Sequence, residues 1–198
     1  LADAPALELP RDRRPGAAPQ AGFAPFALPD PLASRAREAA RRRGVSLYTL
    51  LLGAFALTLS RVADTDDVVL GTDVSGRGPM GTGALVGPLV NTLALRVDLS
   101  GAATLAEAQA RAEQALQETM ARQDTPLDQV VEALNPDRAP GEPIPLFRAK
   151  FDLQQAETLP EALDGLRLER MPLRERAVKY ELRFNLEDDG ARLAGRIE

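Results

Sequence analysis

The chain has 198 residues, a net charge of −5 and a hydrophobic share of 44%, which are typical of one soluble globular domain and not of a disordered chain. It contains no cysteine, which excludes disulfide bonds and Cys-ligated metals, and no histidine, the commonest general base and metal ligand. The 24 Lys and Arg residues are scattered along the chain apart from short clusters at 11–14 and 41–43, and nucleic-acid binding needs a basic face, so we expect no nucleic-acid partner.

Residues 1–22 are rich in proline and lack periodicity, which predicts an extended surface segment. This stretch has no apolar core of the kind found in signal peptides. The longest uncharged run, residues 45–60, is too short to cross a bilayer. We therefore expect a cytoplasmic protein without a membrane partner.

Two helices are predicted in the first third of the chain. Asp30 is expected as the N-cap of a helix over 31–43 that Gly44 terminates. Ser46 is expected to cap a second helix over 47–62. Because this second helix is apolar on most sides, it is expected to be the central helix of the core.

Strands and helices alternate over the rest of the chain, which predicts an α/β fold with a mixed β-sheet covered by helices. A third helix is expected from Thr104 to Gln123 and a short fourth over 127–134. The Asp-Asp-Gly turn at 188–190 is expected to join the last two strands as a hairpin. The expected strands are 23–28, 68–74, 89–97, 146–153, 166–171, 179–186 and 191–197.

A glycine-rich stretch, residues 71–96, is the most distinctive part of the sequence. Residues 76–81 match G-x-G-x-x-G after a strand, the pattern of a dinucleotide-binding turn. That turn must open a helix whose N-terminus holds the pyrophosphate, whereas Gly83, Gly87 and Pro88 follow here. The context therefore argues against nucleotide binding.

Asn91 lies within an otherwise apolar predicted strand, and a buried amide needs hydrogen-bond partners. One interpretation is that its side chain bonds the backbone of a neighbouring loop, and the other is that it points into a tunnel. Gln123 and Asp124, which precede Pro126, are residues typical of a helix end. No Ser/His/Asp or Cys/His set and no metal site can be assembled from the sequence.

Three sequence strings occur in the order found in the condensation domain of nonribosomal peptide synthetases, which the chain resembles. They are Val-Gly-Pro-Leu-Val-Asn-Thr-Leu at 86–93 with Arg96, Arg-Gln-Asp-Thr-Pro-Leu-Asp at 122–128, and Pro-Leu-Phe at 145–147. The second string departs from the family pattern at Arg122, where His or Asn is usual, and has Leu and Asp where Phe and Glu are usual.

The resemblance implies one lobe of a two-lobed, chloramphenicol acetyltransferase-like fold. Residues 23–198 are expected to be the C-terminal lobe and residues 1–22 the extended inter-lobe segment. The family's catalytic His-His-x-x-x-Asp-Gly motif belongs to the N-terminal lobe, so this chain is expected to hold no catalytic residue and to be inactive alone.

Condensation domains form an amide bond between a donor acyl or peptidyl thioester and an acceptor aminoacyl thioester. The resemblance implies that both are carried on phosphopantetheine arms and that this chain binds no cofactor itself. The implied partners are the N-terminal condensation lobe, donor and acceptor peptidyl carrier proteins, and neighbouring synthetase modules.

The resemblance also implies roles for named residues, with Asn91 as the inward-facing one. The expected tunnel and structural residues are Asn91, Thr92, Arg96, Gln123, Asp124 and Pro126. The expected floor loop of the tunnel contains Gly76, Arg77, Gly78, Gly81 and Gly87.

Three alternatives share the same fold. One is a degenerate, non-catalytic relative that recruits a tailoring enzyme such as a cytochrome P450. The second is a lobe of an epimerisation domain, against which the Val-Asn-Thr and Gln-Asp-x-Pro strings argue. The third is a free-standing acyltransferase outside peptide synthesis.

Overall fold

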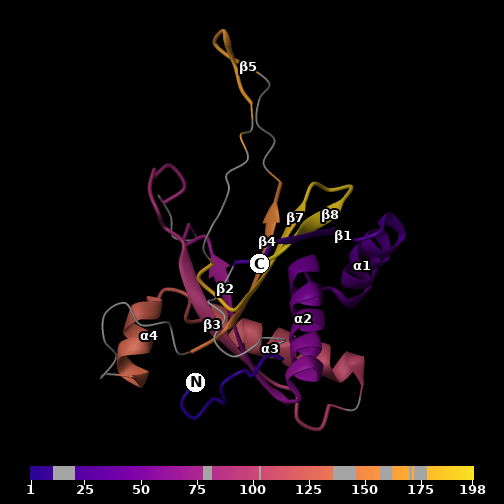
Figure 1. Ribbon diagram of the computed structural model, residues 1–198, viewed down its shortest axis with the longest axis vertical. Coiled ribbons are helices and arrows are strands. Elements are labelled where there is room, and N and C mark those ends of the chain that lie inside the picture. The colour runs from indigo at the N-terminus through magenta and orange to yellow at the C-terminus, as the bar shows by residue number, and fades with distance from the viewer. Residues whose placement is uncertain are drawn as a thin grey trace.

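The computed structural model confirms the predicted α/β class, with a mixed sheet and helices packed on it (Figure 1). It describes residues 1–10, 21–77, 82–102, 104–135, 146–156, 162–169, 171 and 178–198. Gly78 and Gly81 of the expected floor loop lie outside the described residues, as do residues 136–145, which include Pro145 of the third sequence string.

The main sheet has six strands in the order β1-β8-β7-β4-β2-β3. The central pairs β2–β4 and β4–β7 are parallel, whereas β2–β3, β7–β8 and β1–β8 are antiparallel. The strands are β1 (Ala24–Ala27), β2 (Asp67–Val74), β3 (Asn91–Asp98), β4 (Ala149–Gln155), β7 (Leu182–Asp188) and β8 (Leu193–Ile197). Since β3 is the last strand in this order, its outer edge has no strand partner among the described residues.

Four helices lie in the described part of the chain: α1 (Asp30–Arg43), α2 (Leu47–Ala63), α3 (Leu105–Met120) and α4 (Leu127–Leu134). Helices α2 and α3 pack on the sheet and on each other, α1 packs against α2, and α4 lies beside β3 (Figure 1). No single described helix is long and apolar enough to cross a membrane. Helices α1 and α2 together have the length and composition of a span, but the chain bends by 107° between them.

Local capping chemistry explains where the first two helices begin and end. Gly44 ends α1 in the left-handed conformation at φ 69°, and the Ser46 side chain accepts from Thr49 N at 3.0 Å, as predicted. The predicted N-cap at Asp30 is wrong, because Pro29 occupies that position and Asp30 is the first helical residue. Its carboxylate still lies at the positive end of the helix.

Helix α3 begins with a reciprocal capping box between Thr104 and Glu107. It ends at Met120, three residues before the predicted end at Gln123. The chain tightens there, because the backbone N–H groups of Arg122 and Gln123 bond carbonyl groups only three residues back, at 3.0 and 3.2 Å. This tightened turn leads directly into α4.

Four strand predictions need correction. The strand expected over 146–153 is β4 (Ala149–Gln155), and the strand expected over 179–186 is β7 (Leu182–Asp188), so both begin three residues later than predicted. The strand expected over 89–97 begins only at Asn91, which pairs with Val74 at the end of β2. The strand expected over 166–171 is instead a short hairpin of β5 (Ala162–Leu163) and β6 (Leu166–Arg167), with Gly165 at φ 82°. This hairpin projects away from the main sheet (Figure 1).

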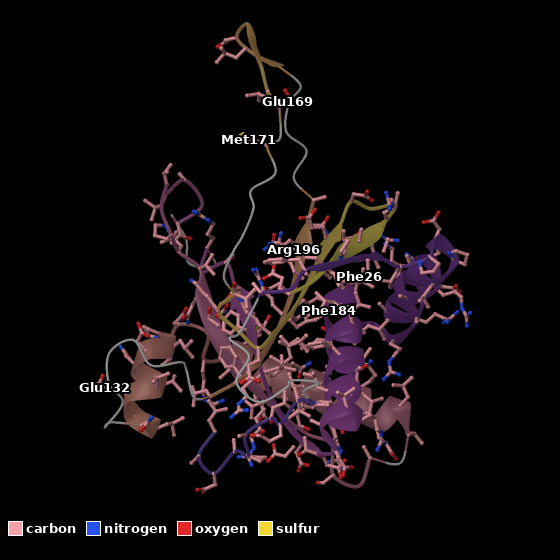
Figure 2. All side chains as sticks on the ribbon, viewed as in Figure 1. Phe26, Glu132, Glu169, Met171, Phe184 and Arg196 are labelled. Atoms are coloured by element: carbon pink, nitrogen blue, oxygen red, sulfur yellow. The ribbon has the colours of Figure 1, made fainter. Side chains whose placement is uncertain are left out.

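The hydrophobic core lies between the sheet and α2 and α3. Helix α2 buries seven residues, but Ala54, Thr58 and Val62 remain exposed, so it is less enclosed than predicted. Phe26 and Phe184 lie side by side within the molecule, with ring centroids 4.8 Å apart (Figure 2). Leu7 also joins the core at 3% exposure, so the predicted surface position of the N-terminal segment is wrong for that residue.

Candidate functional site

Asn91 is the first residue of β3, and its side chain connects this strand to the turn between α3 and α4. Its Nδ2 donates to the backbone carbonyls of Gln123 and Thr125, both at 2.8 Å. The two amide protons therefore bond the backbone of a neighbouring loop, as the first interpretation of this residue describes. The contact brings together two strings of the sequence that lie more than 30 residues apart.

Gln123, Asp124 and Pro126 lie in that turn. Gln123 contributes its backbone carbonyl to Asn91, Asp124 is exposed, and Pro126 is the N-cap residue of α4 at φ −61°. Proline needs no hydrogen-bond partner for its nitrogen and presets the backbone angle for a helix start. The turn is therefore shaped by backbone contacts, and the Asn91 side chain ties it to the sheet.

Thr92 and Arg96 lie on the face of β3 that points away from α2 and α3, and both bind carboxylates of β2. Thr92 Oγ1 donates to Asp73 at 2.7 Å. Arg96 donates two hydrogen bonds to the Asp67 carboxylate, from Nε at 2.9 Å and from Nη2 at 2.6 Å. Its Nη1 donates to the carbonyl of Ala2 at 3.1 Å. The hydrogen bond to Asp67 raises the pKa of Arg96, so the two side chains form a charged pair that joins β3 to β2. The bond to Ala2 joins the N-terminal segment to the same arginine.

An open groove of about 490 Å³ borders these residues. Its floor is β3, including Thr92 and Ala94, and its walls come from Thr119 near the end of α3, from Arg122 in the turn after α3 and from Leu127 of α4. The groove mixes hydroxyl, guanidinium and alkyl groups, which suits an elongated ligand with amide and apolar parts. Its lining also includes the carboxylate of Glu118, and it contains no histidine.

The described part of the expected floor loop is closed at its base by Gly76. This residue has φ 61°, and a side chain there would place Cβ 1.9 Å from the carbonyl oxygen of Leu89. Arg77, the next residue, reaches across the loop to backbone carbonyls that include that of Gly87. Gly87 itself has open space around it.

A row of charged side chains, which the sequence analysis did not single out, crosses the same face of the sheet. Lys150 Nζ lies 2.6 Å from Asp73 and 3.4 Å from Asp152, and Asp152 in turn accepts from Arg183 at 2.8 Å. Arg183 lies 3.6 Å from Glu198, which completes the row. Lys150 and Asp152, which alternate with the apolar residues Ala149, Phe151 and Leu153 in β4, are the sequence signal for this row.

The central charges of this row are buried, and oppositely charged neighbours compensate for their lost hydration. The side chains of Lys150 and Asp152 are only 5% and 4% exposed, and each has at least one oppositely charged partner within 3.4 Å. The ring of Tyr180 covers Lys150 Nζ at 5.4 Å, and burial raises the pKa of that tyrosine. No group of three metal-ligating side chains occurs in the described residues.

Solved structures define the class of fold to which this chain belongs. A complex of the X-domain and OxyB from teicoplanin biosynthesis matches at a TM-score of 0.81 with 24% identity, over 97% of this chain and 43% of the solved chain. The condensation domain of the Monacolin K polyketide synthase MokA matches at 0.78 with 22% identity, over 98% and 47%. The chain therefore folds as one part of a condensation-type fold.

The sequence comparisons give the family. The model of the condensation domain matches residues 1–198, and this chain belongs to that family. It is 34% identical to malpibaldin synthetase of Mortierella alpina, over 98% of this chain and 4% of that protein. It is also 36% identical to phosphinothricin tripeptide synthetase PhsB of Streptomyces viridochromogenes, over 76% of this chain and 13% of that protein. The chain thus spans a small part of the relatives that it matches.

Proposed function

We propose that this chain is the C-terminal lobe of a condensation domain that joins a donor acyl or peptidyl thioester to an acceptor aminoacyl thioester. The contact that carries the proposal is the pair of hydrogen bonds from Asn91 to the turn at Gln123 and Thr125. It joins two of the three sequence strings through which the chain resembles the family, beside a groove suited to an elongated substrate.

In this proposal the lobe builds one wall of the tunnel and part of the carrier docking surface. The described groove residues can orient amide and alkyl groups, and none of them is a histidine, the residue of the family's catalytic motif. The proton transfer would then depend on the N-terminal lobe. The phosphopantetheine arms of the two carrier proteins would bring the substrates, and the chain itself would bind no cofactor.

Amide formation from loaded donor and acceptor carriers, followed by mass spectrometry, tests this division of labour. We expect the 198-residue chain alone to give no product above the uncatalysed rate. Turnover by the chain alone would overturn the proposal, because it would require catalytic groups within this lobe.

A second candidate function is recruitment of a tailoring enzyme. This candidate is motivated by the solved complex of an X-domain with OxyB, whose fold this chain shares at a TM-score of 0.81. Calorimetric titration with the OxyB protein named in that complex separates the two candidates. The recruiting role predicts binding, whereas the condensation role predicts none.

A further inference from the structure

The guanidinium group of Arg77 contacts three backbone carbonyl oxygens of one loop. Nη1 donates to Leu85 at 2.7 Å and to Thr82 at 3.2 Å, and Nη2 donates to Gly87 at 3.2 Å. These carbonyls lie outside any helix or strand. A planar guanidinium with several fixed donors can hold them together, which a single ammonium group cannot do with the same geometry.

The backbone before Arg77 aims its side chain across the loop. Gly76 adopts φ 61°, and the position of its missing Cβ lies 1.9 Å from the carbonyl oxygen of Leu89. The two ends of the loop therefore meet at Gly76, in a conformation that residues with a side chain rarely adopt. Arg77 follows directly and faces the returning half of the loop.

The residues between the bonded carbonyls are apolar and exposed. Leu85 is 53% exposed and Val86 is fully exposed. The amide of Leu85 donates to the carbonyl of Thr82 at 3.1 Å, so Arg77 also supports the turn that precedes them. Arg77 thus fixes the backbone on both sides of Val86.

We propose that Arg77 is a positioning residue whose guanidinium group holds residues 82–87 in one conformation. This role lies within the chain itself and does not rest on the proposed function.

The test follows the loop by NMR in the full 198-residue chain. Arg77→Gln removes the guanidinium, and Arg77→Lys keeps the charge but not the fork. In both variants we expect the carbonyl carbon resonances of Thr82, Leu85 and Gly87 to shift. We expect exchange of the Leu85 amide to become about tenfold faster while the urea midpoint of global unfolding stays unchanged.

Arg111→Lys is the matched control. Like Arg77, Arg111 donates from its guanidinium to the backbone, but it contacts one carbonyl, that of Asp98 at 3.0 Å, which lies outside the loop. It is expected to leave the Leu85 amide unaffected. Unchanged Leu85 exchange in both Arg77 variants would overturn the proposal. An equal change in the control, or a fall in global stability that accounts for the faster exchange, would also overturn it.

Chemical rescue separates positioning from a general loss of packing. In Arg77→Ala, ethylguanidinium is expected to restore slow exchange at Leu85, whereas sodium chloride at the same ionic strength is not. Failure of this rescue, with the variant folded, would contradict a role for the guanidinium fork. Because every readout uses this chain alone, these results are independent of whether the condensation function is correct.

Discussion

At the scale of single residues, Lys150 is the most constrained charged group on the polar face of the sheet. It lies between Asp73 of β2 and Asp152 of its own strand, with almost no exposure to water. A buried charge is tolerated only when its partners compensate for lost hydration. The two carboxylates and the lysine therefore form a unit that connects β2 to β4.

We expect Lys150→Met to destabilise the chain by about 3–5 kcal/mol, because it leaves two carboxylates without their shared cation. Urea unfolding measures this change. Arg42→Ala is the surface control, since the Arg42–Glu38 pair is 67% and 54% exposed and is expected to contribute less than about 1 kcal/mol. A comparable loss in the two variants would contradict the account of the buried row.

Asn91 supports the turn after α3 through two donor bonds. Asn91→Ala leaves the carbonyls of Gln123 and Thr125 without this donor, and we expect a loss of about 1–3 kcal/mol in the free energy of unfolding. Asn91→Asp keeps the shape but cannot donate when ionised, so it is expected to lose at least as much. Full stability in Asn91→Asp would show that the bonds contribute nothing.

At the scale of elements, α2 and α3 approach closely at Gly53. A Cβ at this position would lie 2.3 Å from Oε1 of Gln109, whose Nε2 donates to the carbonyl of Leu50 at 2.8 Å. The glycine and the buried glutamine therefore fit each other. This fit determines how near the two central helices can lie.

Gly53→Ala is expected to destabilise the chain by about 1–3 kcal/mol, although alanine is the better helix former, because Gln109 must move and lose its bond. Thermal or urea unfolding measures the loss. Combining it with Gln109→Ala removes the clash, so the double variant is expected to be less destabilised than the sum of the two single changes. Simple additivity would contradict this packing argument.

Tyr48 joins α2 to β2 through its hydroxyl contact with Thr72 at 2.5 Å. Burial raises the pKa of Tyr48 from 10.0 to about 12. The neutral phenol is therefore favoured in the folded state, and its contribution is complete below pH 10. It is lost as the pH rises from about 10, where the unfolded chain ionises, to about 12.

We expect the free energy of unfolding to fall by about 1.4 kcal/mol between about pH 8 and pH 11 through Tyr48. Tyr48→Phe removes this part of the pH dependence, so the difference between the two unfolding curves isolates it from other groups that titrate in the same range. Parallel pH dependence in the two proteins would refute the burial effect.

At the scale of the whole molecule, the sequence predicts what local chemistry decides. Helix ends at Gly44 and Thr104 follow from capping, and strand positions follow from apolar runs. The charged row through Lys150 was missed, because only the sheet order places β2, β4 and β7 side by side. The three carbonyl contacts of Arg77 were missed for a similar reason, since a loop conformation is not encoded by spacing.

The candidate site was predictable only through resemblance. Spacing alone could not bring Asn91 to the turn at Gln123, because the contact depends on how α3 returns along the sheet. The strand β3 begins at Asn91 and not at Leu89, since the chain at Leu89 is still closing the loop on Gly76. The fold brings Asn91 and the turn together, but their roles in a tunnel stay a prediction.

The central claim is that this chain supplies the wall of a condensation tunnel whose chemistry lies in a second lobe. The most direct measurement replaces the matching region of malpibaldin synthetase by this chain and follows amide formation with loaded carriers. The account predicts product formation that depends on the N-terminal lobe. A folded chimera that binds loaded carriers but forms no amide would contradict it.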